Sequence, residues 1–255
     1  MERFKDKVVI ITGAGSGIGA ATAKRFASEQ ANVVLVGRTQ DKLEQLATQM
    51  PNKDKVLVHP ADVSDDAQVR ALMDATIERF GQIDVLVNNA GVAVQKRIPD
   101  ASDDDWSRVM RINVDGVFYC CRAALPHLLK TRGNIVNTSS VSGIGGDWAM
   151  GIYNASKGAV TNFTRALALD HGGDGVRVNA VCPSLTRSEL TAKMFDNDEL
   201  MAKFADRMPT GRAAEPEEVG DVIAFLASDD ARFVNGVNLP VDGGLSASNG
   251  QPNMS

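Results

Sequence analysis

Short runs of β-branched residues alternate with amphipathic stretches along the whole 255-residue chain. The runs are apolar at consecutive positions, which is typical of strands buried on both faces. The predicted strands are residues 7–12, 32–37, 55–59, 85–88, 134–138, 177–181 and 237–241. The helical patterns between them cover residues 20–29, 41–50, 67–80, 106–132, 153–170 and 216–227. This alternation predicts an α/β fold, in which a parallel sheet of about seven strands carries helices on both faces.

The composition favours one soluble domain with a small-molecule partner. An apolar content of 44% supplies a full core for a single domain over residues 1–255, and no repeat or linker divides the chain. The formal net charge is −5, and no basic run exceeds two residues. Nucleic acid and anionic membranes are therefore not expected as partners.

The charged N-terminal segment, the lack of long apolar runs and the cysteines predict a cytoplasmic protein. Residues 1–9 are rich in charge, and no apolar run reaches the roughly 18 residues of a membrane helix. Cys120, Cys121 and Cys182 fit neither a disulfide framework nor zinc spacing, which suits a reducing compartment. The three histidines are scattered without nearby ligand-type residues, so we expect no metal site.

A glycine-rich turn follows the first predicted strand. The segment "TGAGSGIG" (residues 12–19) places Gly13, Gly15, Gly17 and Gly19 directly before an alanine-rich helix. Glycines let the backbone approach a pyrophosphate closely, and the N-terminus of a helix favours negative charge. The common fingerprint with glycine at its first, third and sixth places fails at Ile18, but strand, turn and helix follow in the required order. The turn predicts dinucleotide binding on a Rossmann-type, doubly wound sheet.

Six short motifs resemble those of the short-chain dehydrogenase/reductase family. They are "TGAGSGIG" (12–19), "NNAG" (88–91), Asn113, "NTSS" (137–140), "YNASK" (153–157) and "PVDGG" (240–244). They occur in the family's order and at its spacings over essentially the whole chain. The resemblance implies a nicotinamide-dependent oxidoreductase that acts on an alcohol or ketone and commonly forms homotetramers.

Tyr153 and Lys157 lie four residues apart, on one face of a predicted helix. A nearby ammonium favours the phenolate, so we expect Lys157 to lower the pKa of Tyr153 toward the working pH of a general acid or base. Ser140 precedes Tyr153 by thirteen residues and follows a predicted strand. By resemblance, Ser140 holds the substrate oxygen, Tyr153 transfers the proton, Lys157 also binds the nicotinamide ribose, and Asn113 supports a water relay.

The resemblance also assigns residues to the cofactor. Gly13, Ser16, Gly17, Ile18 and Gly19 form the pyrophosphate turn, Asp62 and Val63 meet the adenine, and Asn89 packs against the adenosine ribose. Either Thr186 or Ser188 supplies a hydroxyl to the carboxamide.

The end of the second strand bears on the choice of cofactor. Gly37 stands where relatives that prefer NAD carry aspartate, and Arg38 offers a fork suited to a 2′-phosphate. This favours NADP(H), with NAD(H) as the alternative, since Ser16 stands where many NADP-dependent members have a second basic residue.

Two segments outside these motifs bear on the substrate. Residues 187–212 carry a helical pattern that resembles the family's substrate lid, and residues 246–255 form a polar tail. "GGDW" (145–148) and stretches of the second half resemble acetoin- and butanediol-converting members of the family. Trp148 would then wall a compact pocket or, alternatively, pack in the lid or at a subunit interface. The alternatives are a 3-oxoacyl-thioester reductase and, in a different class, a non-catalytic NAD(P)-binding sensor or scaffold.

Overall fold

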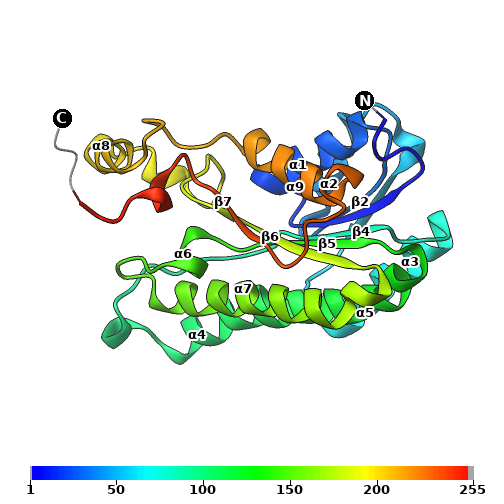
Figure 1. The fold of residues 1–255 in the computed structure, drawn as a ribbon, viewed down its shortest axis with the longest axis horizontal. Coiled ribbons are helices and arrows are strands. Elements are labelled where there is room, and N and C mark those ends of the chain that lie inside the picture. The colour runs from blue at the N-terminus through cyan, green and yellow to red at the C-terminus, as the bar shows by residue number, and fades with distance from the viewer. Residues whose placement is uncertain (1, 252–255) are drawn as a thin grey trace.

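A single parallel sheet of seven strands forms the centre of the molecule. In the computed structural model, which describes residues 2–251, the strands lie in the order β3-β2-β1-β4-β5-β6-β7 (Figure 1). Their bounds are β1 Val8–Thr12, β2 Asn32–Gly37, β3 Val56–Pro60, β4 Val85–Asn88, β5 Asn134–Thr138, β6 Arg177–Pro183 and β7 Asn238–Val241. All seven lie within two residues of the predicted ranges, and the predicted α/β fold is confirmed. The last four residues of the predicted tail lie outside the described residues.

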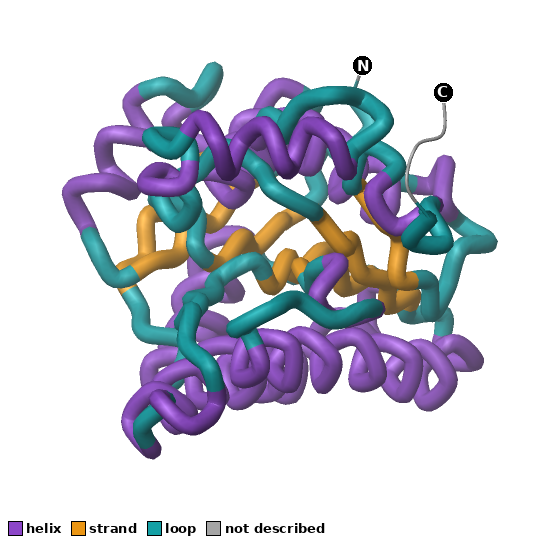
Figure 2. Tube along the Cα trace, turned by 90° about the vertical axis from the view of Figure 1, so that its left-hand side faces the viewer, coloured by secondary structure: helices purple, strands orange, loops and turns teal. Residues whose placement is uncertain are grey.

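Helices cover both faces of the sheet, so that the strands form the middle of three layers (Figures 1 and 2). One outer layer holds α1 (Gly17–Ser28), α2 (Gln40–Thr48) and α9 (Pro216–Ala227). The other holds α3 (Asp66–Phe80), α4 (Asp103–Met110), α5 (Gly116–Thr131) and α7 (Gly151–His171). The short helix α6 (Val141–Ile144) follows β5, and α8 (Asp198–Arg207) lies in the long connection between β6 and α9.

Successive residues of the central strands contribute to two separate apolar cores. Val8 and Ile10 of β1 pack in the core beneath α3, α5 and α7, whereas Val9 and Ile11 pack in the core beneath α1, α2 and α9. Side chains alternate across a strand, so a strand covered on both faces has to be apolar at every position. Burial of one such side chain contributes about 1.5–3 kcal/mol. This requirement explains the unbroken runs in the sequence.

The predicted helix over residues 106–132 is interrupted in the structure. A π-helical turn, Arg111–Asp115, separates α4 from α5 and contains the buried Asn113. Such turns change the direction in which a side chain leaves the helix, and they occur often at functional sites. The apolar periodicity continues across the turn, which is why the sequence pattern does not reveal it.

The chain reverses its direction of sheet growth after β3. It builds β1, β2 and β3 toward one edge, then returns to add β4 on the other side of β1. A crevice opens at the carboxyl ends of the strands where such a reversal occurs. The topology therefore places the ends of β1 and β4, and the loops that follow them, at one site. No helix within residues 2–251 is long and apolar enough to span a bilayer.

Candidate active site

Two adjoining cavities occupy the crevice at the carboxyl ends of the strands. The larger, of about 270 Å³, extends from the glycine turn to Ser140, Tyr153 and Lys157. The smaller, of about 140 Å³, extends toward Arg38 and Asp62. Gly13, Ala90 and Gly91 line both cavities. Together they form one elongated groove that suits a ligand with two separate halves.

The glycine turn has a backbone that larger residues would not adopt. Gly13 and Gly17 have φ angles of 66° and 52°, in the left-handed region that favours glycine. A Cβ atom at position 19 would lie 2.2 Å from the Gly13 carbonyl oxygen. Ser16 precedes α1 in an extended conformation, and its side chain does not cap the helix. The N-terminus of a 12-residue helix therefore faces the groove, as the binding of a pyrophosphate requires.

Asn89 joins the end of β4 to this turn. Its side-chain amide donates to the carbonyl oxygens of Thr12, at 3.1 Å, and Gly13, at 3.3 Å. Its backbone N–H donates to the Thr12 hydroxyl at 3.0 Å. These hydrogen bonds hold the loop after β4 against the glycine turn at the point where the two cavities meet. Asn89 therefore shapes the groove by supporting its backbone.

The far end of the groove holds the residues that the sequence assigns to adenosine. Arg38, Asp62 and Val63 line the smaller cavity together with Gly37. Asp62 accepts hydrogen bonds from the backbone N–H and the hydroxyl of Ser64, at 2.9 and 2.8 Å, so its carboxylate also organises the turn after β3. Arg38 forms no ion pair with any residue between positions 2 and 251, and its guanidinium is free to meet a ligand anion.

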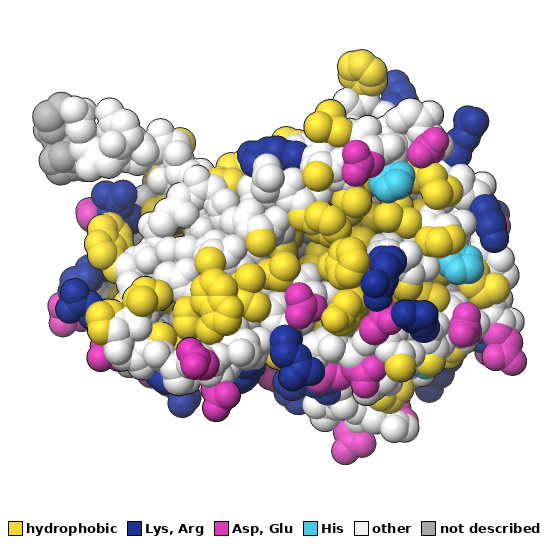
Figure 3. All heavy atoms as spheres, turned by 90° about the horizontal axis from the view of Figure 1, so that it is seen from below, with side chains coloured by type: hydrophobic (Ala, Val, Ile, Leu, Met, Phe, Trp, Pro, Cys, Tyr) yellow, Lys and Arg dark blue, Asp and Glu magenta, His cyan; other side chains and the backbone are white. Residues whose placement is uncertain are grey.

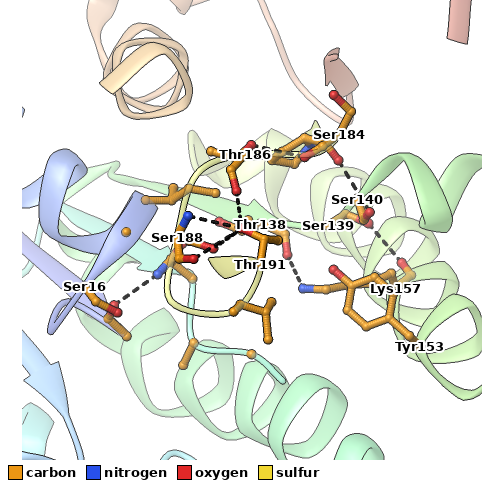
Figure 4. A pocket seen from close by; sticks show the side chains of 18 residues that line it. Ser16, Thr138, Ser139, Ser140, Tyr153, Lys157, Ser184, Thr186, Ser188 and Thr191 are labelled. Carbon is orange, nitrogen blue, oxygen red and sulfur yellow. Dashed lines mark hydrogen bonds between the residues drawn. The ribbon is translucent and has the colours of Figure 1, made fainter. Parts of the chain in front are cut away.

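Ser140, Tyr153 and Lys157 meet at the other end (Figure 4). Ser140 follows β5 and caps α6, while Tyr153 and Lys157 lie one turn apart near the start of α7. The Lys157 ammonium donates to the Thr138 carbonyl oxygen at 2.7 Å and lies 5.7 Å from the centre of the Tyr153 ring. The three predicted side chains thus line one cavity, although they come from separate elements.

Burial dominates the electrostatics of this end. Burial is the main reason that the pKa of Tyr153 rises to about 12. The hydrogen bond with Ser140 lowers this pKa, and the negative charge of Asp147 raises it further. Burial also lowers the pKa of Lys157 to about 8. The expectation that Lys157 lowers the pKa of Tyr153 is therefore wrong for the protein alone. The ammonium donates to the Thr138 carbonyl, and desolvation of the phenol is the largest cause of the shift in the Tyr153 pKa.

Asn113 lies behind the cavity wall. Its side-chain oxygen accepts from the Val92 N–H at 2.8 Å, and its amide donates to the Val92 carbonyl at 2.9 Å and to Ser156 at 3.0 Å. The residue is 1% exposed. It clamps the loop after β4 against α7, next to Gly91 and Lys157.

The segment after β6 lies over the glycine turn. A Cβ atom at Gly17 would lie 2.9 Å from the Cβ of Ser188, and Glu189 forms an ion pair with Lys42 of α2 at 2.7 Å. Both Thr186 and Ser188 line the larger cavity. The Thr186 hydroxyl donates to Ser184, and the Ser188 hydroxyl bonds Thr191. The open choice between these two hydroxyls therefore stays open.

The substrate side differs from expectation at Trp148. This side chain is 91% exposed and lines a wide cavity of about 850 Å³ with residues of α8 and with Pro240, Leu245 and Ser246, so it does not wall a compact pocket. The sequence analysis singled out Trp148 and overlooked its neighbour Asp147, whose carboxylate accepts a hydrogen bond from Ser142. Only the tertiary structure reveals that contact, because a single aspartate in a loop gives no signal in the sequence.

Comparison with known proteins identifies the family. A family model described as enoyl-(acyl carrier protein) reductase matches residues 13–246. A short-chain dehydrogenase/reductase from Brucella melitensis superposes with a TM-score of 0.91 at 35% identity, covering 95% of this chain and 98% of that one. The chain belongs to the short-chain dehydrogenase/reductase family. The resemblance seen in the motifs is confirmed.

Relatives within the family share the type of reaction. Meso-2,3-butanediol dehydrogenase of Serratia marcescens is 54% identical over 99% of both chains. NADP-dependent (R)-specific alcohol dehydrogenase of Lentilactobacillus kefiri is 38% identical, over 96% of this chain and 99% of its own. Levodione reductase superposes with a TM-score of 0.92 at 38% identity, covering 96% of this chain and all of that one. The protein is an oxidoreductase that transfers hydride between a nicotinamide cofactor and a secondary alcohol or ketone.

Proposed function

We propose that this enzyme interconverts acetoin and 2,3-butanediol, with Ser140, Tyr153 and Lys157 as its catalytic residues. One observation carries the proposal: these side chains line the same cavity as the glycine turn, so a substrate held at Ser140 lies beside a bound dinucleotide. The 54% identity to a meso-2,3-butanediol dehydrogenase supports the choice of substrate.

The groove fits a nicotinamide dinucleotide. Gly13, Gly17 and the N-terminus of α1 would hold the pyrophosphate, and Lys157 the nicotinamide ribose. Gly19 contributes by its lack of a side chain, which lets α1 start against Gly13. When bound, the nicotinamide supplies or accepts the hydride.

The protein residues supply the proton and orient the substrate. Tyr153 donates its proton to the substrate oxygen in reduction and receives one in oxidation, and Ser140 holds the same oxygen by a hydrogen bond. Lys157 lies about one helical turn from Tyr153, and its positive charge stabilises the phenolate that forms during the reaction. Asn113 acts by holding the loop after β4 and, through Ser156, the first turns of α7.

We propose a preference for NADP(H), with NAD(H) as the alternative. The guanidinium of Arg38, which has no ion-pair partner among residues 2–251, lines the end of the groove. Gly37 leaves room beside it and places no carboxylate there to repel a phosphate. Segment 187–212 is proposed as the substrate lid, because its first residues already lie over the glycine turn.

We further propose a cytoplasmic homotetramer. Apolar side chains gather on the face formed by α4, α5 and α7 (Figure 3), and three large apolar residues of α4 and α5, Trp106, Phe118 and Leu129, are 48%, 42% and 37% exposed. Apolar patches of this kind are typical of subunit interfaces. The three buried free thiols suit a reducing compartment. Light scattering of the purified protein tests the tetramer, and a monomer would contradict it.

Substitution of Tyr153 tests the proposed chemistry. Tyr153→Phe removes the proton donor and keeps the ring, so kcat should fall more than tenfold, a loss above about 1.4 kcal/mol, while cofactor affinity stays near that of the wild type. Lys157→Ala should impair both. Stopped-flow turnover and cofactor fluorescence titration measure the two effects. If Tyr153→Phe retained more than a tenth of the wild-type rate, the assignment of Tyr153 as proton donor would be wrong.

Initial rates on a substrate panel test the proposed substrate. We expect acetoin and diacetyl to be reduced and 2,3-butanediol oxidised at the highest kcat/KM. The panel also includes a 3-oxoacyl thioester as the alternative substrate, because a 38% identical relative from Thermotoga maritima is a 3-oxoacyl-[acyl-carrier-protein] reductase. Turnover of the thioester alone would replace the proposed substrate, and turnover of none would favour the sensor or scaffold.

A further inference from the structure

Three side chains beside the catalytic end form a continuous hydrogen-bonded row. The Ser140 hydroxyl donates to the Ser142 hydroxyl at 3.1 Å, and the Ser142 hydroxyl donates to a carboxylate oxygen of Asp147. Ser140 and Ser142 are buried, at 6% and 4% exposure. The row therefore links the proposed substrate-binding hydroxyl to a negative charge in the neighbouring loop.

The carboxylate fixes the direction of every bond in the row. A hydroxyl has one proton to donate, and an ionised carboxylate only accepts. Ser142 donates its proton to Asp147 and can only accept from Ser140. The Ser142 backbone N–H donates to the Ser140 oxygen at 3.1 Å, which also favours a Ser140 proton that points away from this N–H.

The direction of the row matters at the substrate oxygen. A ketone oxygen needs donors, whereas an alcohol hydroxyl brings its own proton and needs an acceptor. The Pro183 carbonyl oxygen is a second acceptor near the Ser140 hydroxyl, but it lies farther away, at 3.4 Å. With its proton directed to Ser142, Ser140 keeps one lone pair for a donor in the cavity, either the Tyr153 hydroxyl or a bound alcohol. Binding of a ketone as hydrogen-bond acceptor requires Ser140 to give up its bond to Ser142.

We propose that Asp147 is a positioning residue that orients the Ser140 proton through Ser142 and thereby favours bound alcohol over bound ketone. The inference rests on the proposed role of Ser140. The loop that carries Asp147 is fixed independently, because the Asn154 side chain donates to the Asp147 carbonyl at 3.1 Å. Besides Asp147 itself, the charged groups that line the adjoining cavity are Lys203 and Arg207 of α8, and they form no hydrogen bond with Ser140, Ser142 or the Asp147 carboxylate among the described residues.

Abortive ternary complexes measure this preference without turnover. Diacetyl is titrated into enzyme with oxidised cofactor, and 2,3-butanediol into enzyme with reduced cofactor. In Asp147→Asn the amide can donate to Ser142 and reverse the row, so diacetyl should bind more tightly and butanediol more weakly. We expect the ratio of the two dissociation constants to change roughly three- to tenfold, the equivalent of one hydrogen bond. An unchanged ratio overturns the proposal.

A double-mutant cycle separates the row from a direct effect of charge. Ser142→Ala should shift the ratio in the same direction as Asp147→Asn, and Asp147→Asn should add nothing in the Ser142→Ala background. Ser142→Thr keeps a hydroxyl and should restore the wild-type ratio. Asp206→Asn on α8 removes an exposed carboxylate outside the row and should leave the ratio unchanged.

The outcomes distinguish the row from the function on which it rests. Asp147→Asn could change the ratio equally in the wild-type and Ser142→Ala backgrounds. That result would overturn the proposal, because it would show that the Asp147 charge acts directly on Tyr153 or on the ligand and not through Ser142. If wild-type enzyme binds neither ligand, the proposed substrate fails instead. The same cycle is then run with the ketone and alcohol that the wild-type enzyme turns over.

Discussion

At the residue scale, burial moves the pKa values of the two proposed catalytic groups in opposite directions and away from each other. Tyr153 reaches about 12 and Lys157 falls to about 8, because each charged form loses its hydration in the same cavity. Between these two values the protein alone holds a neutral phenol beside a neutral amine. A change in pH near 8 therefore acts on Lys157 first.

The pH dependence of ketone reduction should report this amine. The positive charge of Lys157 is present below pH 8 and is lost as the pH rises through 8, so kcat/KM for reduction should fall with a midpoint near pH 8. The profile of kcat/KM for the reduced cofactor is measured from pH 6 to 10 at saturating ketone, because this constant reports the pKa values of the free enzyme. Lys157→Arg, whose guanidinium does not titrate in this range, should lose the midpoint. A wild-type profile that is flat from pH 7 to 9 would contradict the prediction.

Arg38 provides the residue-scale test of cofactor choice. Gly37→Asp with Arg38→Ala introduces a carboxylate and removes the guanidinium, so the ratio of kcat/KM for NADPH over NADH should fall at least about tenfold, as for the loss of one charge-assisted pair. Single substitutions assign the effect to either position. An equal preference before and after the exchange would show that Arg38 does not contact a 2′-phosphate.

At the element scale, the start of α1 depends on close backbone contact. The helix begins within reach of Gly13 only because position 19 has no side chain, and the same packing exposes its N-terminus to the groove. Segment 187–212 then covers this turn through Ser188 and the ion pair of Glu189 with Lys42. The pair is solvent-exposed and contributes at most about 1 kcal/mol. The contact of this segment with α2 through Glu189 is therefore weak.

Two glycines of the turn form a matched pair for testing this packing. Gly19→Ala forces a methyl group against the Gly13 carbonyl, which should lower the free energy of unfolding by about 1–3 kcal/mol and weaken cofactor binding. At Gly15 the nearest atom to a new Cβ would be Lys42 Cβ, at 3.4 Å, so Gly15→Ala should be nearly neutral. Urea denaturation and cofactor titration measure both variants. Equal effects would show that contact with Gly13 is unimportant.

At the scale of the whole molecule, one buried carboxylate joins distant parts of the chain. Glu29, at the end of α1, accepts hydrogen bonds from Arg3 at 2.6 Å and from Arg25 at 2.8 Å. Arg3 also reaches Asp230, which follows α9. The N-terminal segment is thus held against two helices of the same layer.

This cluster should make stability depend on acid pH. Hydrogen bonds from Arg3 and Arg25 lower the pKa of Glu29 from 4.5 to about 2. Its contribution, of up to about 3 kcal/mol, is present above pH 4.5 and is lost as the pH falls from 4.5 toward 2. Glu29→Gln should therefore be less stable than wild type at pH 7, with a smaller difference at pH 3. Glu78→Gln, on the exposed face of α3, is the control. An unchanged urea midpoint at pH 7 for Glu29→Gln would contradict the prediction.

The sequence by itself determined the fold and which side chains share the crevice. Strands buried on both faces have to be apolar at every position, and a parallel sheet brings the ends of its strands together, so Ser140, which follows a predicted strand, could be expected at the crevice. The resemblance to the family grouped it with Tyr153 and Lys157. The family motifs added the chemistry. These properties depend on residues close together in the chain.

The tertiary structure alone decided how the grouped side chains interact. Lys157 bonds to Thr138, burial raises the pKa of Tyr153, Asn113 lies in a π-helical turn, and Asp147 reaches Ser142. Each of these depends on how deeply distant elements bury a group and on which acceptor lies within 3 Å of it. Desolvation and hydrogen-bond direction are set by that packing, and no spacing in the sequence encodes them.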